Sequence, residues 1–150
     1  MGIARSLAIS ASALTAERLR MDVIANNVAN VHTTGPEGPY KRQRVVFRAM
    51  SAGPFSSALA EQMGVGPRQG DAVGSGVEVV RVETDEAPGQ RVYEPENPDA
   101  DEGGYVTYPN VNIVSEMVDM LAATKAYQAN VTVINATKAM ALKAISIGGR

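Results

Sequence analysis

The sequence predicts an α+β fold in which long N- and C-terminal helices pack as an antiparallel coiled coil, with a small β-rich insert between them. Three observations support this prediction. Apolar residues recur every seven positions near both ends, no Gly or Pro occurs between residues 113 and 147, and short β-branched runs separated by Gly and Pro fill the middle. We therefore expect an N-terminal helix of the helical core within residues 1–34, a β-rich region within 35–109 and a C-terminal helix within 110–150.

The N-terminal helix is predicted over about residues 4–30. Three asparagines, Asn26, Asn27 and Asn30, stand near its end, although the asparagine amide competes for backbone hydrogen bonds inside a helix. A local role at the helix end, as a cap or as the lead into the turn, accounts for Asn30 easily and for the other two less well, because capping needs only the terminal residue. The alternative is that the amides set the register between helices, as a buried Asn does in coiled coils. Two lines of seven-residue spacing run along this segment: Leu7, Leu14, Met21 and Val28 form one, and Ile9, Ala16, Val23 and Asn30 form the other.

The C-terminal helix has clear ends. Asn112 is a plausible N-cap, Glu116 lies near the first turn, where negative charge is favoured, and Gly148 and Gly149 end the helix. Three seven-residue lines are more than one partner helix can cover, so we expect some neighbours to belong to other molecules. These lines are Ala126, Val133, Met140 and Ile147; Met120, Tyr127, Ile134 and Ala141; and Val114, Leu121, Gln128, Asn135 and Leu142.

The middle of the chain contains strand candidates and turns. Residues 53–76 hold six Gly and two Pro, and we interpret them as a mobile insertion with one helical turn near 56–63. Strands are predicted at 44–50, 77–83, 90–94 and 105–108, and turns at 35–40 and 95–104.

No catalytic, cofactor-binding or metal-binding residues are predicted. The chain has no Cys and a net charge of −2, so neither a thiolate site nor a nucleic-acid or membrane partner is indicated. His32, the only histidine, is expected to be an exposed polar residue just past the helix end. The run "DADEGG" begins like a calcium loop, but Gly103 and Asn110 stand where further ligands belong, which favours an acidic surface turn.

The N-terminal run "SALTAERLRMDVIANNVANVHTT" resembles the signature of bacterial flagellar rod and hook proteins, in which a helix leads into Ala-x-Asn-x-Ala-Asn and a Thr-rich turn. The runs "GPEGPYKRQRVVF" and "VYEPENPDADEGGYVTYPNVN", with the helix that follows, are more specifically similar to proximal rod proteins. The resemblance covers about residues 5–50 and 77–148, and 51–76 match no pattern. Where the family has Gly-His-Pro, this chain has Glu96, Asn97 and Pro98.

The resemblance implies a structural subunit of the flagellar rod, the drive shaft that crosses the periplasm. Its implied partners are other rod proteins, copies of itself, and ring and export-gate components of the basal body. It also implies export by the flagellar type III apparatus without a cleaved signal, for which an easily unfolded chain is suited. The alternatives are a different flagellar axial protein, a helical adaptor without a filament role, or a small enzyme using an acid pair in residues 99–102.

In an antiparallel helix pair joined near residues 30 and 113, opposed positions have numbers that sum to roughly 143. Gln128 and Asn135 would then lie near Thr15 and Ala8, out of reach of Asn26 and Asn27 in the same chain. We therefore expect the asparagines to hydrogen-bond a neighbouring subunit through Gln128 and Asn135. The predicted subunit interface comprises Leu7, Leu14, Met21, Asn26, Asn27, Val28, Asn30, Met120, Tyr127, Gln128, Val133, Ile134, Asn135, Met140, Leu142 and Ile147.

Overall fold

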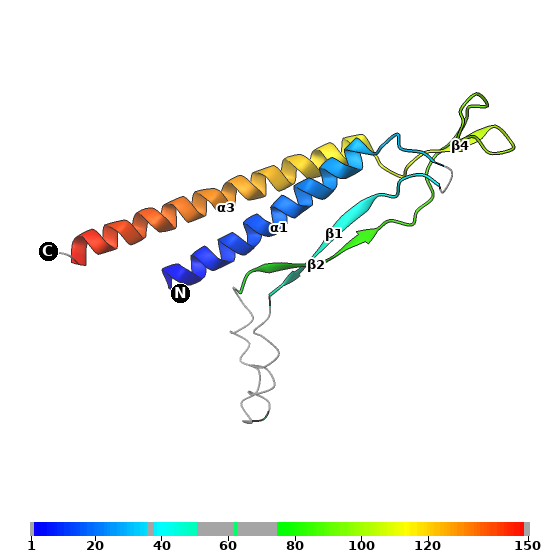
Figure 1. The fold of residues 1–150 in the computed structure, drawn as a ribbon. Helices are drawn as coiled ribbons and strands as arrows, with labels where there is room; N and C mark the ends of the chain where they lie inside the picture. Colours follow the sequence, from blue (N-terminus) through cyan, green and yellow to red (C-terminus); the bar gives the residue numbers. More distant parts are fainter. Residues whose placement is uncertain (1, 36–37, 51–61, 63–74, 149–150) are drawn as a thin grey trace. The chain divides into compact units, whose positions relative to one another are not determined.

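The computed structural model describes residues 2–35, 38–50, 62 and 75–148. Each helix and strand expected in these parts of the chain is present, with its ends within one residue of the prediction (Figure 1). Most of the predicted insertion 53–76, including its helical turn, lies outside the described residues. The elements are α1 (Ile3–Ala29), β1 (Gln43–Ala49), β2 (Val77–Thr84), β3 (Arg91–Tyr93), β4 (Tyr105–Thr107) and α3 (Ile113–Gly148).

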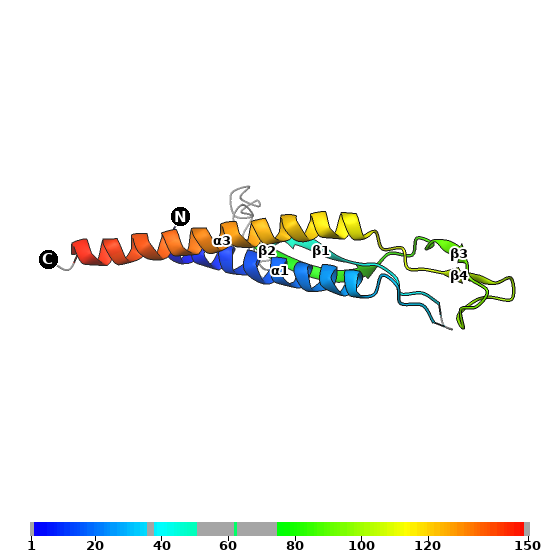
Figure 2. The same ribbon diagram turned by 90° about the horizontal axis from the view of Figure 1, so that it is seen from above.

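The two helices lie side by side in both views (Figures 1 and 2). The start of α3 is capped as the sequence predicts, because Asn112 Oδ1 accepts hydrogen bonds from the backbone N–H groups of Val114 and Ser115, at 3.0 and 3.2 Å. α3 runs for 36 residues without interruption and ends at Gly148. The helical parts of the predicted α+β fold are therefore present.

The residues divide into two compact units, each containing part of both helices and part of β1 and β2. Unit 1 combines the described residues of Met1–Glu17, Phe47–Val80 and Ala126–Arg150. Unit 2 combines Arg18–Val46 and Arg81–Lys125. The contacts that position the candidate site all lie within unit 2.

The strands form two separate two-stranded sheets, β1 with β2 and β3 with β4. In the antiparallel β3–β4 pair, Val92 lies opposite Val106, which is buried, and the rings of Tyr93 and Tyr105 meet edge to face at 5.2 Å. Gly104 has a φ of 77° and lies so close to the Tyr93 ring that a Cβ would approach it to 2.9 Å. Glycine is therefore needed to close the predicted turn.

The buried residues of the helices are mostly small or polar. On α3 the buried or half-buried positions include a seven-residue line that the sequence analysis did not single out, Glu116, Ala123, Asn130 and Thr137. On α1 the buried residues are Ser10, Ala16, Val23, Ile24 and Asn27. Small and polar side chains thus make up most of the buried helix positions, and many large apolar side chains are left at the surface.

Candidate functional site: a buried polar network and exposed helix faces

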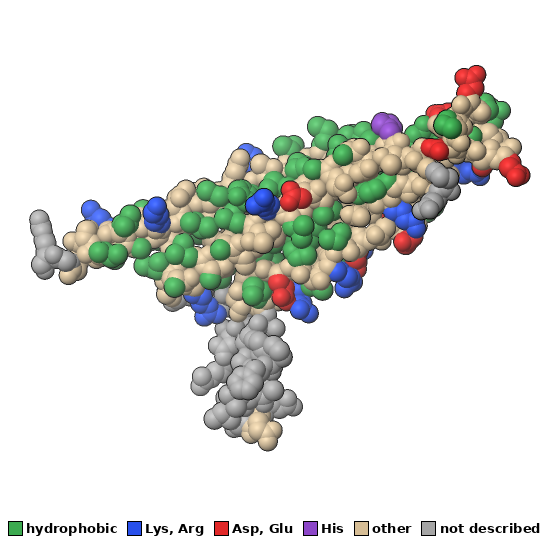
Figure 3. Space-filling view, in the orientation of Figure 1, with side chains coloured by type: hydrophobic (Ala, Val, Ile, Leu, Met, Phe, Trp, Pro, Cys, Tyr) green, Lys and Arg blue, Asp and Glu red, His purple; other side chains and the backbone are tan. Residues whose placement is uncertain are grey.

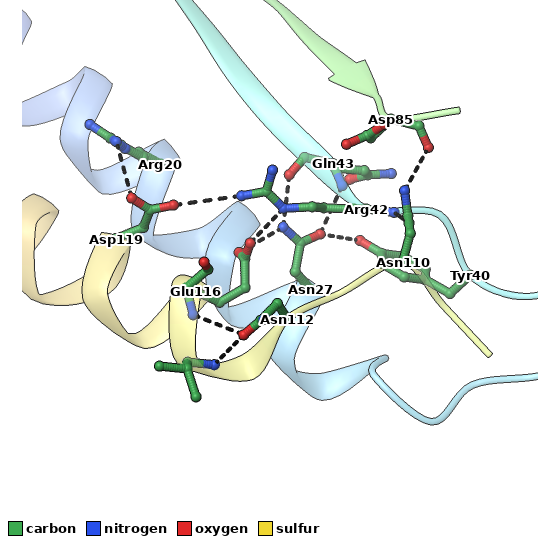
Figure 4. A network of polar contacts seen from close by, with 12 residues as sticks. Arg20, Asn27, Tyr40, Arg42, Gln43, Asp85, Asn110, Asn112, Glu116 and Asp119 are labelled. Atoms are coloured by element: carbon green, nitrogen blue, oxygen red, sulfur yellow. Dashed lines mark hydrogen bonds and ion pairs between the residues drawn. The ribbon is translucent and has the colours of Figure 1, made fainter. Parts of the chain in front are cut away.

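A polar network in unit 2 joins the end of α1, the start of β1 and the first turn of α3 (Figure 4). Its central side chains are Asn27, which is 1% exposed, and Glu116, which is 0% exposed. Buried polar groups destabilise a fold unless hydrogen bonds satisfy them, so their partners decide whether the network is stable. We define the polar network as Asn27, Tyr40, Arg42, Gln43, Asn110 and Glu116.

The Asn27 amide has a complete set of partners inside the chain. Its Nδ2 donates to the Gln43 carbonyl at 2.7 Å and to Glu116 Oε2 at 2.9 Å. Its Oδ1 accepts from the Gln43 N–H at 2.9 Å and from the Tyr40 hydroxyl at 2.8 Å. An amide offers two donors and two acceptor positions, and all four are used. Within the chain no donor or acceptor position of Asn27 is left for the neighbouring subunit that the sequence analysis expected it to bond, so its contacts here are internal.

Glu116 is the partner that sequence reasoning missed. The numbers of Asn27 and Glu116 sum to 143, as antiparallel pairing predicts, but the partner is a carboxylate and not one of the expected amides. Glu116 Oε1 also accepts from Arg42 Nε at 2.6 Å, which gives the buried carboxylate an opposite charge. Arg42 in turn lies 3.6 Å from Asp119 on the next turn of α3. The carboxylate therefore ties the start of α3 to both α1 and the segment entering β1.

Asn110 extends the network toward β2. Its Oδ1 accepts from the Arg42 N–H at 2.9 Å, and its Nδ2 donates to the Asp85 carbonyl at 3.2 Å. The Asp85 N–H also donates to the Arg42 carbonyl, at 2.7 Å. These contacts hold the segments that enter and leave the helices in one arrangement. The network has a structural role, since the side chains of Asn27, Asn110 and Glu116 bond to other parts of the same chain.

The other two asparagines make local contacts. Asn26 is exposed and donates to the Tyr40 hydroxyl at 3.2 Å. Burial raises the pKa of Tyr40, with smaller opposing and reinforcing effects from Asn26 and Glu116. Asn30 donates to the Asn26 carbonyl at 2.9 Å and accepts from Thr33 at 3.1 Å. Asn30 thus closes the helix end, which is the local role that the sequence allowed for it.

The structure places the predicted interface residues in three environments. Only Asn27 is fully buried, and it belongs to the polar network. The half-buried residues are Leu7, Leu14, Met21, Val28, Asn30, Met120, Tyr127 and Ile134. The exposed residues are Asn26, Gln128, Val133, Asn135, Met140, Leu142 and Ile147.

Large apolar side chains are exposed along α3, and hydrophobic atoms are visible over much of the face drawn in Figure 3. None of the large apolar residues exposed near the start of the helix was included in the predicted interface, although Val114 and Leu121 lie on one of the predicted lines. Such a contiguous exposed group on a folded chain is typical of a protein–protein contact. We define the α3 patch as Ile113, Val114, Met117, Val118 and Leu121, which are 40–72% exposed.

The acidic loop does not have the character of a catalytic acid. The backbone N–H groups of Tyr105 and Gly103, with the Arg91 guanidinium, hold the pKa of Asp101 below its ordinary value. A general acid needs a raised carboxyl pKa. Asp99 accepts a hydrogen bond from Thr34 at 2.6 Å. The carboxylates of this loop therefore stabilise its conformation.

His32 is exposed, as expected, and its ring lies edge-on to Tyr108 at 6.2 Å. Among the described residues, no group of three or more His, Cys, Asp or Glu side chains could hold a metal ion. A search of the same residues finds no helix with the length and apolar character needed to cross a membrane.

Two family descriptions match the ends of the chain. Residues 7–36 match "Flagella basal body rod protein", and residues 102–147 match "Flagellar basal body rod FlgEFG protein C-terminal". Together they include most of α1 and nearly all of α3.

Full-length relatives give the same assignment. The chain is 43% identical over 155 residues to the flagellar basal-body rod protein FlgC of Borreliella burgdorferi, with 98% of each chain covered. It is 46% identical over 149 residues to FlgC of Bacillus subtilis, with 95% and 96% covered, and 44% identical over 142 residues to FlgC of Escherichia coli O157:H7, with 93% of each covered. The chain therefore belongs to the FlgC family of flagellar basal-body rod proteins, and it is a structural subunit of the rod and not an enzyme.

Proposed function

We propose that this subunit polymerises with other rod proteins and with copies of itself into a helical drive shaft that transmits motor torque. In the proposed assembly α1 and α3 form an antiparallel coiled coil within each subunit. The contacts of unit 2 support this direction: Asn27 meets Glu116, and Met21 Sδ lies 3.6 Å from the Thr124 hydroxyl further along α3. Partner numbers on α3 rise as those on α1 fall, as they do in an antiparallel pair.

The observation that carries the proposal is the exposure of large apolar side chains on α3 far beyond what a single helical partner covers. Val114, Leu121 and Ile147 are each more than half exposed, as are Met140, Leu142 and Ile145. Removing apolar surface from water stabilises the assembled state by about 25 cal/mol per Å² of surface covered. A subunit surrounded by neighbours would cover these side chains, and the predicted interface residues other than Asn27 are the proposed contacts.

The proposal includes the setting of the assembly. We place the rod across the periplasm, with ring and export-gate components of the basal body as further partners, and with export by the flagellar type III system without a cleaved signal. Retention of the N-terminal residues is supported by their packing in unit 1. Ser10 is buried in α1, and Ser12 Oγ accepts a hydrogen bond from the Val77 N–H at 3.1 Å.

Substitution of an exposed apolar residue tests the proposal. Leu142→Asp places a charge on an exposed face of α3, so it should leave the free chain folded as before and abolish incorporation into the rod and swimming. The measurement is the amount of the chain in isolated basal bodies, with swimming in soft agar. Lys143→Asp is the matched control, because it introduces the same side chain at the next exposed position, and we expect it to assemble. Normal swimming with Leu142→Asp would contradict the proposed contact.

A further inference from the structure

The α3 patch continues along the helix to a lysine. Val114, Met117, Val118 and Leu121 have the i, i+3, i+4, i+7 spacing that places side chains on one helix face, and Lys125 follows one turn later. Lys125 is exposed, and no salt bridge to it occurs within the described part of the chain. This face therefore consists of a row of large apolar side chains, and the row ends at the unpaired ammonium group of Lys125.

α1 presents a face of the opposite character. Asp22, Ala25 and Ala29 have the i, i+3, i+7 spacing, and all three are exposed. The two alanines leave room for large side chains from another helix. Asp22 has no ion-pair partner in the described ranges. This face therefore offers small side chains and an unpaired anion.

The spacings of the two faces agree. In unit 2, α1 and α3 run in opposite directions, so two copies with the same orientation can bring α3 of one antiparallel to α1 of the next. If Lys125 meets Asp22, Leu121 lies level with Ala25 and its neighbour Asn26, and Val118 lies level with Ala29. Large side chains then meet small ones, and the cation meets the anion.

We infer that Val118, Leu121 and Lys125 of α3 dock on the Asp22–Ala29 face of a second copy of this chain. The inference rests on the proposed function and names the partner of one of its surfaces. The contact is heterologous, because two different faces meet. Each copy therefore keeps one free face of each kind, and the contact extends into an open array instead of closing as a dimer.

Cysteine cross-linking tests the contact, since the chain has no cysteine of its own. In basal bodies isolated from cells that carry the Asp22→Cys, Lys125→Cys double variant, mild oxidation should give a ladder extending beyond the dimer. Each single variant should remain monomeric. The control pair, Asp22→Cys with Lys138→Cys, uses another exposed lysine of α3 about 20 Å further along the helix, beyond disulfide reach.

Any of three results would overturn the inference: the double variant is incorporated but gives no ladder, the control pair cross-links equally well, or a single variant gives dimers. Each of these results would leave the proposed function intact. Absence of the unaltered chain from basal bodies would instead contradict the proposed function.

If the double cysteine variant is not incorporated into basal bodies, exchanging the charges of the two residues tests the inference instead. Asp22→Lys and Lys125→Asp should each reduce swimming several-fold, and combining them should restore most of it. A combined variant as impaired as the worse single variant would overturn the inference.

Discussion

At the scale of single residues, Asn27 and Glu116 determine how the helix pair is joined. The sequence indicated that an asparagine in this place needs an explanation beyond capping, and it indicated which α3 position lies opposite. It did not indicate that the partner is a carboxylate, because Glu116 also suits a helix N-terminus, where its charge has a sufficient local reason. Arg42 could not be assigned either, since its position depends on the path of the chain between α1 and β1.

The Asn27→Leu variant tests this joint. Leucine removes all four hydrogen bonds and leaves the Glu116 carboxylate and the Gln43 backbone groups without one partner each. An unsatisfied buried group costs about 1–3 kcal/mol, so we expect the chain itself to lose at least that much stability, and not only its ability to assemble. Urea unfolding followed by tyrosine fluorescence measures the change, because the chain has no Trp.

Asn26→Leu is the matched control, since it makes the same substitution at the adjacent, exposed position. We expect a change below about 1 kcal/mol, because an exposed hydrogen bond contributes little net stability. Equal unfolding midpoints for both variants would show that the four contacts of Asn27 do not stabilise the chain.

At the scale of elements, periodicity together with the capping, Gly and Pro residues predicted where each helix and strand begins and ends, but these signals did not predict which face of α3 meets α1. The three apolar lines of α3 were expected to be covered by several neighbours, some of them other molecules. Within the chain, the line through Val114, Leu121 and Leu142 is exposed, whereas Glu116, Ala123 and Thr137 are buried. Small side chains permit close helix approach, and two of these three are polar, so a pattern of hydrophobicity alone cannot identify the line.

The two ends of α3 should differ in local stability. The first turn is held by the polar network, whereas residues 138–148 are exposed except for Ala141, which is half-buried. Few buried contacts favour local opening. Hydrogen exchange of the free chain should therefore be fast at the amides of 138–148 and slower at those of 117–125. In isolated basal bodies both segments should be protected. Equal protection of the two segments in the free chain would contradict this difference.

At the scale of the whole molecule, the chain is a subunit whose surface is only partly accounted for by its own fold. The fold class and the family followed from the sequence, because helix periodicity and the family's turn motifs are local in sequence. The subunit contacts stay a prediction, because they depend on side chains exposed in one chain and on a second molecule that the sequence does not describe. The half-buried predicted residues, such as Leu14 and Ile134, are partly covered within the chain itself.

The central claim is that the exposed apolar faces of α3 are subunit contacts in the rod. A cryo-electron microscopy map of isolated basal bodies, at a resolution that shows side chains, tests it most directly. The account predicts that Val114, Leu121 and Leu142 of each copy are covered by neighbouring rod subunits, while Asn27 keeps its contact with Glu116 within the chain. A map in which these three apolar side chains face solvent in the assembled rod would contradict the claim.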